Sequence, residues 1–113
     1  MTAPVKRNTV VLRRGERHPI WAKPGPDDPP GPYQMRFVNA FSEDPTPWVD
    51  AVQDTYPDAA DEPGIYVWAA NDVTSDNPAG TAVLTPGRYT VEVQYTVGSV
   101  LDIEPLPDLI QVE

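Results

Sequence analysis

Hydrophobic and polar side chains alternate along residues 88–97, which is the pattern of a β-strand with one buried and one wet face. Tyr and Val occupy every second position there, and Thr, Glu and Gln occupy most of the positions between them. Residues 33–41 alternate in the same way. The side chains that this second run places on its buried face are Tyr33, Met35, Phe37 and Phe41. Strands of this kind are typical of antiparallel sheets that pack on one side only.

Shorter apolar runs predict the remaining strands. Residues 65–70 are apolar at both odd and even positions, which favours a central strand covered on both sides. The other β-prone runs are 9–12, 20–22, 48–52, 81–84, 100–103 and 109–112. Residues 24–32 and 53–64 predict loops, with room for one helical turn at 58–62, and residues 98–99 predict a tight turn. About seven or eight short strands without a long helix favour an all-β sandwich or small barrel.

Composition limits the architecture further. The chain has 113 residues, enough for one domain with one core, and its 15 prolines favour stiff loops between short strands. It contains no cysteine, which excludes disulfides and zinc–thiolate sites. No apolar run approaches the roughly 18–20 residues of a membrane helix, and basic residues interrupt the N-terminus where a signal peptide would be apolar. We therefore expect one soluble domain over residues 1–113, made in the cytoplasm and without a membrane partner.

Charge is distributed unevenly along the chain. Residues 1–23 carry six cations and one acid, a net charge of +5, whereas residues 24–113 carry two cations and sixteen acids, a net charge of −14. An acidic body repels nucleic acid, so no nucleic-acid partner is expected. Residues 1–23 predict either a basic N-terminal arm or an edge strand of the domain. Such a segment could contact an acidic protein surface, or neutralise the acidic body of its own or a neighbouring copy.

Residues 86–93, Pro-Gly-Arg-Tyr-Thr-Val-Glu-Val, resemble the penultimate strand of many immunoglobulin-like sandwiches. There a Pro-Gly turn precedes a tyrosine, here Tyr89, which starts the strand and packs at a corner. Residues 65–113 are similar to the immunoglobulin-like domains of tailed-bacteriophage virions, such as the N-terminal domain of baseplate upper proteins and small capsid-decorating domains. Residues 1–64 fit only in general pattern.

This resemblance implies an immunoglobulin-like antiparallel β-sandwich of about seven to eight short strands with Pro-rich loops. It also implies a structural role without catalysis. The chain lacks both core cysteines of antibody-type domains, so the resemblance implies no disulfide.

Candidate catalytic chemistry is sparse. His18 is the only histidine, and it lies between Arg17 and Pro19 with no nucleophile motif nearby, so a surface contact is its simplest role. The acids that could offer oxygen ligands to calcium are Asp58, Asp61, Glu62, Asp72 and Asp76. Their spacing matches no EF-hand, and the sequence contains no phosphate-binding loop and no nucleic-acid motif. We therefore expect no enzyme activity, no catalytic residue, no metal and no cofactor.

Aromatic and basic side chains are the candidate binding residues. Trp21, Trp48 and Trp68 are candidates to stack on sugar, but Trp68 and the face of Tyr89 are more simply explained as core. Trp21 and Trp48 lie next to proline-rich segments, where they could cap the sandwich or enter an interface. The residues expected in a protein interface are Arg13, Arg14, Arg17, Trp21 and Trp48.

The resemblance implies a non-enzymatic structural protein of a phage virion, made in the host cytoplasm and acting as a capsid decoration or minor capsid protein. Its expected partners are the major capsid protein or other virion proteins, and further copies of itself in a symmetric assembly. Two alternatives stay open: a baseplate or tail-tip adaptor, and a carbohydrate-binding module for host adsorption or polysaccharide metabolism. A hydrolase with paired carboxylates is the least supported class, because some pair among so many acids always lies close together.

Overall fold

The computed structural model describes residues 9–23, 32–55, 63–73, 75–97 and 100–113. Three predictions from the sequence fall outside these ranges in whole or in large part: the loop at 24–32, the helical turn at 58–62 and the tight turn at 98–99. The loop predicted at 53–64 is wrong at both ends, because residues 53–55 and 63–64 belong to strands.

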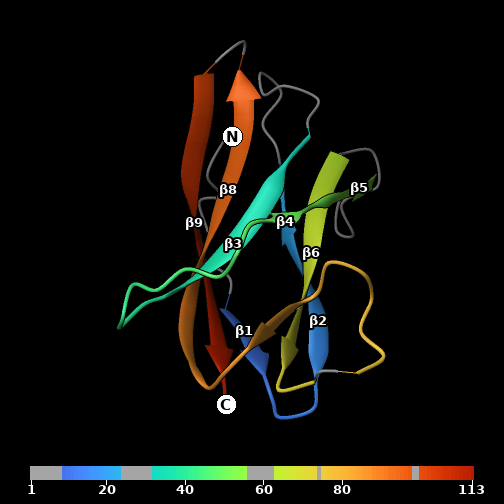
Figure 1. Ribbon diagram of the computed structural model, residues 1–113, viewed down its shortest axis with the longest axis vertical. Coiled ribbons are helices and arrows are strands. Elements are labelled where there is room, and N and C mark those ends of the chain that lie inside the picture. The colour runs from blue at the N-terminus through green and yellow to red at the C-terminus, as the bar shows by residue number, and fades with distance from the viewer. Residues whose placement is uncertain (1–8, 24–31, 56–62, 74, 98–99) are drawn as a thin grey trace.

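The described residues form nine β-strands and no helix, which confirms the all-β prediction (Figure 1). The strands are β1 (Thr9–Leu12), β2 (Arg17–Ala22), β3 (Gln34–Asn39), β4 (Val49–Asp50), β5 (Val52–Thr55), β6 (Pro63–Asn71), β7 (Ala82–Leu84), β8 (Gly87–Val97) and β9 (Val100–Val112). No helix in the described part of the chain is long and apolar enough to cross a membrane.

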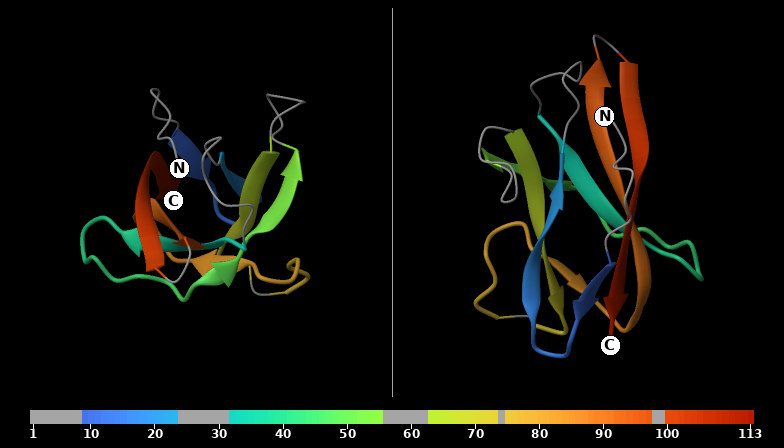
Figure 2. Two further views of the ribbon diagram at one scale, coloured as in Figure 1. Left: turned by 90° about the horizontal axis from the view of Figure 1, so that it is seen from above. Right: turned by 180° about the vertical axis from the view of Figure 1, so that it is seen from behind.

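The strands make two sheets, which Figure 2 shows from above and from behind. One sheet has the order β1-β9-β8-β3-β4, and the other has the order β2-β6-β5 with β7 also paired to β6. Five of the seven pairings between described strands are antiparallel. The pairs β1–β9 and β6–β7 are parallel, which departs from the wholly antiparallel prediction. Both parallel pairs are short, at four and three residue pairs, so the two sheets remain mainly antiparallel.

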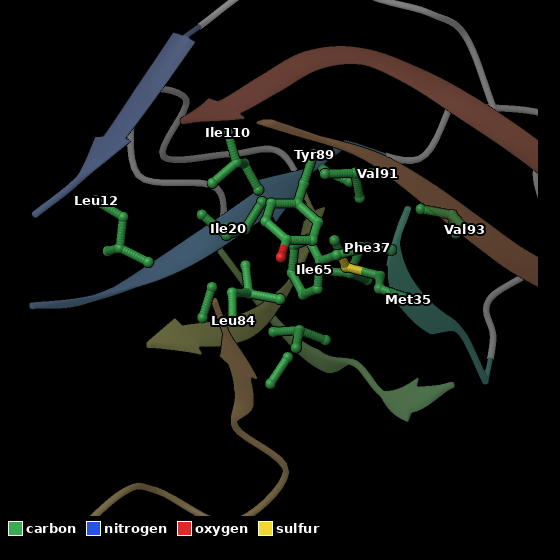
Figure 3. Packing of buried hydrophobic residues seen from close by; sticks show 14 of the residues in the cluster. Leu12, Ile20, Met35, Phe37, Ile65, Leu84, Tyr89, Val91, Val93 and Ile110 are labelled. Carbon is green, nitrogen blue, oxygen red and sulfur yellow. The ribbon is translucent and has the colours of Figure 1, made fainter. Parts of the chain in front are cut away.

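The hydrophobic core lies between the two sheets and draws side chains from both (Figure 3). Among the largest fully buried side chains are Leu12, Met35, Phe37, Val91, Val93 and Ile110 from the first sheet, and Ile65 and Leu84 from the second. The predicted inner faces are confirmed at Tyr33, Met35 and Phe37, and at Tyr89, Val91, Val93 and Tyr95. Each such side chain gains about 1.5–3 kcal/mol from burial, so this layer supplies most of the driving force for folding.

Phe41 is an exception, because its side chain is 98% exposed where the alternation predicted a core position. Strand β3 ends at Asn39, whose side-chain oxygen accepts hydrogen bonds from the backbone amides of Phe41 and Ser42, both at 2.9 Å. An asparagine that satisfies the amides just after it favours a turn over a strand. The extended pattern therefore stops two residues before Phe41.

Strand β6 is central, as predicted, since β2 pairs on one side and β5 and β7 pair on the other. The prediction that both its faces are covered holds only in part, and Trp68, predicted in the core, is half-buried. Ile65, Val67 and Ala69 point into the core, whereas Tyr66 and Trp68 are half-buried on the outer face. Ala70, at the next position on that outer face, is fully buried.

Strand β9 joins two predicted strands into one of 13 residues, although it contains Pro105 and Pro107. The register with β8 shifts between Thr90, opposite Leu109, and Val91, opposite Leu106, so residues 107–108 have no partner in β8. Strand β1 pairs only with residues 109–112 of β9, which leaves residues 100–108 at an edge in the described sheet. Proline is tolerated at edges and bulges, which explains why it does not end this strand.

Tyr89 packs at the turn that leads from β7 into β8. Its hydroxyl donates a hydrogen bond to the carbonyl oxygen of Thr85 at 2.9 Å and lies 3.1 Å from the Thr85 hydroxyl. Gly87, between them, has a φ of 152°, and a Cβ there would lie 3.2 Å from the side-chain nitrogen of Asn39. Glycine is therefore needed both for the backbone angle and for the close approach of the neighbouring turn.

Residues 9–23 form edge strands of the sandwich, so the basic part of the chain that the structure describes is built into the fold. Leu12, Ile20 and Ala22 contribute to the core. Asn71, buried at the end of β6, fixes the end of β1 because its side-chain amide donates to the carbonyl oxygens of Leu12 at 2.9 Å and of Glu113 at 2.8 Å. One side-chain amide thus ties β6 of the second sheet to the ends of β1 and β9, which are neighbours in the first sheet.

Candidate functional site

The outer face of the sheet β2-β6-β5 gathers apolar side chains that strand periodicity directs away from the core. In the register, Trp21 of β2 lies opposite Tyr66 of β6, and Tyr66 lies opposite Val52 of β5. Two residues further along the same pair of strands, Pro19 of β2 lies opposite Trp68 of β6. Residues at alternate positions of neighbouring strands form continuous rows on one face of a sheet. We call the resulting surface, made of Pro19, Trp21, Val52, Tyr66, Trp68 and Val83, the aromatic face.

The three aromatic rings of this face contact one another in sequence. The ring centroids of Trp21 and Tyr66 are 4.6 Å apart with planes tilted by 45°, and those of Tyr66 and Trp68 are 6.3 Å apart and nearly perpendicular at 87°. Val52 on β5 and Val83 on β7 are 46% and 43% exposed beside them. The rings hold each other in place, and all three residues are half-buried.

Charged groups flank the aromatic face unequally. Arg17 and Lys23 lie at the two ends of β2, where Lys23 is exposed and the guanidinium of Arg17 donates a hydrogen bond to the backbone oxygen of Asp76. On the opposite side, Asp54 of β5 is exposed. The β2 margin of the face is therefore cationic and the β5 margin is anionic. A partner with acidic groups would be oriented with those groups toward β2.

The turn between β1 and β2 carries the other two arginines predicted for the interface. Arg14 is exposed, and its guanidinium lies 3.7 Å from the carboxylate of Asp72, itself well exposed. The backbone amide of Arg13 donates to the Glu16 carboxylate at 2.7 Å, which closes the turn, while the Arg13 side chain is exposed. An exposed ion pair contributes only about 0–1 kcal/mol, so these arginines add charge more than stability.

Trp48, the remaining predicted interface residue, lies on the other sheet. The guanidinium of Arg36 sits 4.3 Å from its ring centroid and also pairs with Glu92 at 2.7 Å. Beside this pair, the Gln34 side chain donates to Asp50 at 2.9 Å and accepts a hydrogen bond from Gln94. This outer face is thus a polar network in which Trp48 supports a cation. The structure places Trp21 and Arg17 on the same face of β2 and leaves Trp48 on a separate surface.

Sequence reasoning missed Val52, Tyr66, Trp68 and Val83 as members of a surface. A signal was present within residues 65–70, because both large rings fall at even-numbered positions, while all the odd-numbered positions hold aliphatic or small residues. A strand buried on both sides has no reason to segregate its side chains in that way. An outer aromatic face is the simpler interpretation.

Comparison with known proteins adds no relative: no family model, no curated protein and no solved structure matches this chain. Within the part of the chain that the structure describes, no group of three or more His, Cys, Asp or Glu residues could hold a metal ion. Three of the candidate calcium ligands, Asp58, Asp61 and Glu62, lie outside the described residues.

Proposed function

We propose that the chain is a non-enzymatic structural protein that docks on a larger assembly through its aromatic face. The observation that carries this proposal is the outward cluster of Trp21, Tyr66 and Trp68, with aliphatic neighbours on the adjoining strands. Trp and Tyr are the residues most enriched at the energetic centres of protein interfaces, where their rings bury large areas at low cost in side-chain entropy. A contiguous exposed apolar patch indicates an interaction site, whereas scattered apolar residues do not.

We further propose that this assembly is a tailed-phage virion, with the chain as a capsid decoration or minor capsid protein. The resemblance of residues 86–93 supports this, together with the hydrogen bond from the Tyr89 hydroxyl to the Thr85 carbonyl oxygen. The strand orders β9-β8-β3-β4 and β2-β6-β5 agree with the G-F-C-C′ and B-E-D orders of immunoglobulin-like sandwiches. The alternative place in the particle, a baseplate or tail-tip adaptor, differs in copy number and not in the docking face.

Carbohydrate binding is the second candidate function, because aromatic rings on a sheet surface can stack on sugars. The ring geometry favours a protein partner instead. Planes that differ by 45° and 87° within two neighbouring pairs do not form one flat platform. An apolar surface made of tilted rings is complementary to the side chains of a protein partner rather than to the planar face of a sugar.

The test is reattachment of the purified chain to particles that lack it, with bound protein measured by gel densitometry. The wild-type chain is expected to saturate the particles at a fixed copy number. The double variant Trp21→Ser/Trp68→Ser should bind at least tenfold more weakly. The loss of an aromatic ring at the centre of a protein interface costs about 2 kcal/mol of binding free energy. Many copies per particle support a decoration role, and few copies support a baseplate adaptor.

The matched control is Leu101→Ala, which removes a 57% exposed apolar side chain on the other sheet. This variant should attach like the wild type. Circular dichroism should show that all three proteins are folded. Full occupancy by the double variant would overturn the docking role of the aromatic face, and glycan-array binding that depends on Trp21 and Trp68 would replace it with the carbohydrate function.

A further inference from the structure

The loop between β3 and β4 presents one apolar ring at the surface of an otherwise polar turn. Phe41 is 98% exposed, which is far above the exposure of its apolar neighbours on the strands. In Figures 1 and 2 this loop projects from the sandwich on the side away from β2 and β6. A phenylalanine in this position adds no buried apolar area to its own chain and so does not stabilise its fold. Its surface remains available for a contact between molecules.

The backbone of this loop is held by hydrogen bonds. Asn39 accepts from the amides of Phe41 and Ser42 through its side chain, and its own carbonyl accepts from the Glu43 amide at 2.8 Å. The Asn39 amide donates in turn to the carbonyl oxygen of Asp44 at 3.0 Å. Glu43 takes a φ of 63°, which completes the tight reversal.

The base of the loop is fixed as well. The Phe37 amide donates to the hydroxyl of Thr46 at 3.0 Å, and the Thr46 amide donates to the carbonyl oxygen of Phe37 at 2.8 Å. A bridge between Val38 and Pro45 closes the neck. A ring presented by a braced loop loses little backbone entropy on binding, which is the condition for an efficient anchor.

The charges around Phe41 complement one margin of the aromatic face. Glu43 and Asp44 are exposed next to it and make this tip anionic. On the aromatic face, Arg17 and Lys23 lie along β2, where the Arg17 guanidinium donates to the backbone oxygen of Asp76, and the exposed Asp54 lies across the face on β5. An acidic tip with an apolar ring therefore fits the aromatic face in one orientation, with its carboxylates toward β2.

We propose that Phe41 of one copy of this chain inserts into the aromatic face of a second copy, among Trp21, Tyr66 and Trp68. This inference rests on the proposed docking role of that face and names its occupant. The loop and the face lie on different sides of the molecule, so Phe41 cannot reach the aromatic face of its own chain. A contact between two different surfaces is heterologous, and it builds a ring where the rotation closes and a filament where it does not.

Sedimentation velocity of the purified chain over a range of concentrations tests this inference. The wild type is expected to self-associate, and Phe41→Ala should weaken the association at least tenfold, as expected for loss of a central aromatic anchor. Trp21→Ser/Trp68→Ser should weaken it similarly, and the control Leu101→Ala should not. Glu43→Lys/Asp44→Lys should also weaken it, with an effect that falls as salt rises.

Mixing the variants gives the sharpest readout. Phe41→Ala keeps an intact face and Trp21→Ser/Trp68→Ser keeps an intact loop, so a mixture can form one loop–face contact per pair. The mixture is therefore expected to give discrete dimers while each variant alone stays monomeric. Failure of the mixture to dimerise, or unchanged self-association of Phe41→Ala, would overturn the inference. Self-association that survives in Trp21→Ser/Trp68→Ser would overturn it too, because the loop would then contact another surface.

The two proposals can fail separately. If Phe41→Ala attaches to particles at full occupancy and the wild type stays monomeric in solution, this inference fails and the docking role stands. If the mixed variants dimerise while Trp21→Ser/Trp68→Ser attaches to particles like the wild type, the loop–face contact stands and the docking role on the particle fails.

Discussion

Replacing Val93 by Asp is expected to leave the chain unfolded at room temperature. Val93 is fully buried on β8, opposite Met35 of β3, within the layer between the sheets. A carboxylate placed there loses its hydration and gains no designed partner, which costs several kcal/mol whether it stays charged or takes up a proton. A domain of this size is stable by about 5–15 kcal/mol in total, so one such substitution consumes most of that margin.

The control for this experiment is Thr96→Asp, which adds the same charge to an exposed position of the same strand. Thermal unfolding followed by circular dichroism should give a cooperative transition for the control near that of the wild type, and none for Val93→Asp. A cooperatively folded Val93→Asp protein with an unchanged melting temperature would mean that the faces of β8 are assigned the wrong way round.

Replacing Asn71 by Ala should cost about 3 kcal/mol of stability. The substitution removes two hydrogen bonds and leaves the carbonyl oxygens of Leu12 and Glu113 without that donor, in a place where Asn71 itself is 1% exposed. Each lost bond contributes about 0.5–1.5 kcal/mol, so the two together account for up to about 3 kcal/mol, while the Leu12 carbonyl keeps its bond from the Glu113 amide. The melting temperature should fall by roughly 12–24 °C for a domain of this length.

The effect at Asn71 should be local in origin. Its backbone bonds to Glu16 and Gly15 remain in the variant, so the loss falls on the pairing of β1 with the rest of the sheet. Hydrogen exchange should show faster exchange in residues 9–12, with the centre of β8 less affected. Asn71→Asp keeps the shape of the side chain but replaces its donor by a carboxylate oxygen, which cannot donate to the backbone oxygens of Leu12 and Glu113. This variant should therefore be at least as unstable as Asn71→Ala. An Asn71→Asp protein as stable as the wild type would contradict the hydrogen-bond account.

Periodicity predicts this fold well where one face of a strand is apolar and the other polar. Residues 88–97 satisfy that condition, and their inner face agrees with the structure wherever it is described. The same reasoning fails at Phe41. The Asn39 side chain accepts hydrogen bonds from the backbone amides of Phe41 and Ser42, which ends the strand although the alternation of apolar and polar residues continues to Phe41. It fails again at Trp68, because alternation cannot distinguish a core side from an outer side when both are apolar.

The candidate site is only partly visible in the sequence. Trp21 and Arg17 can be singled out as an apolar anchor and a cation, but their neighbours on β6 and β5 are fixed by the register of the sheet. That register depends on contacts across long stretches of chain, which no local pattern encodes. For the same reason, Trp48 cannot be assigned to a separate surface until the sheets are known.

The central claim is that the aromatic face becomes covered when the chain assembles. Hydroxyl-radical footprinting of the chain, free and attached to particles, measures this at individual side chains by mass spectrometry. Trp21, Tyr66 and Trp68 are expected to oxidise several-fold more slowly when the chain is attached, while Trp48, on the other sheet, keeps its free rate. Protection of Trp48 with unchanged oxidation of Trp21 and Trp68 would contradict the account.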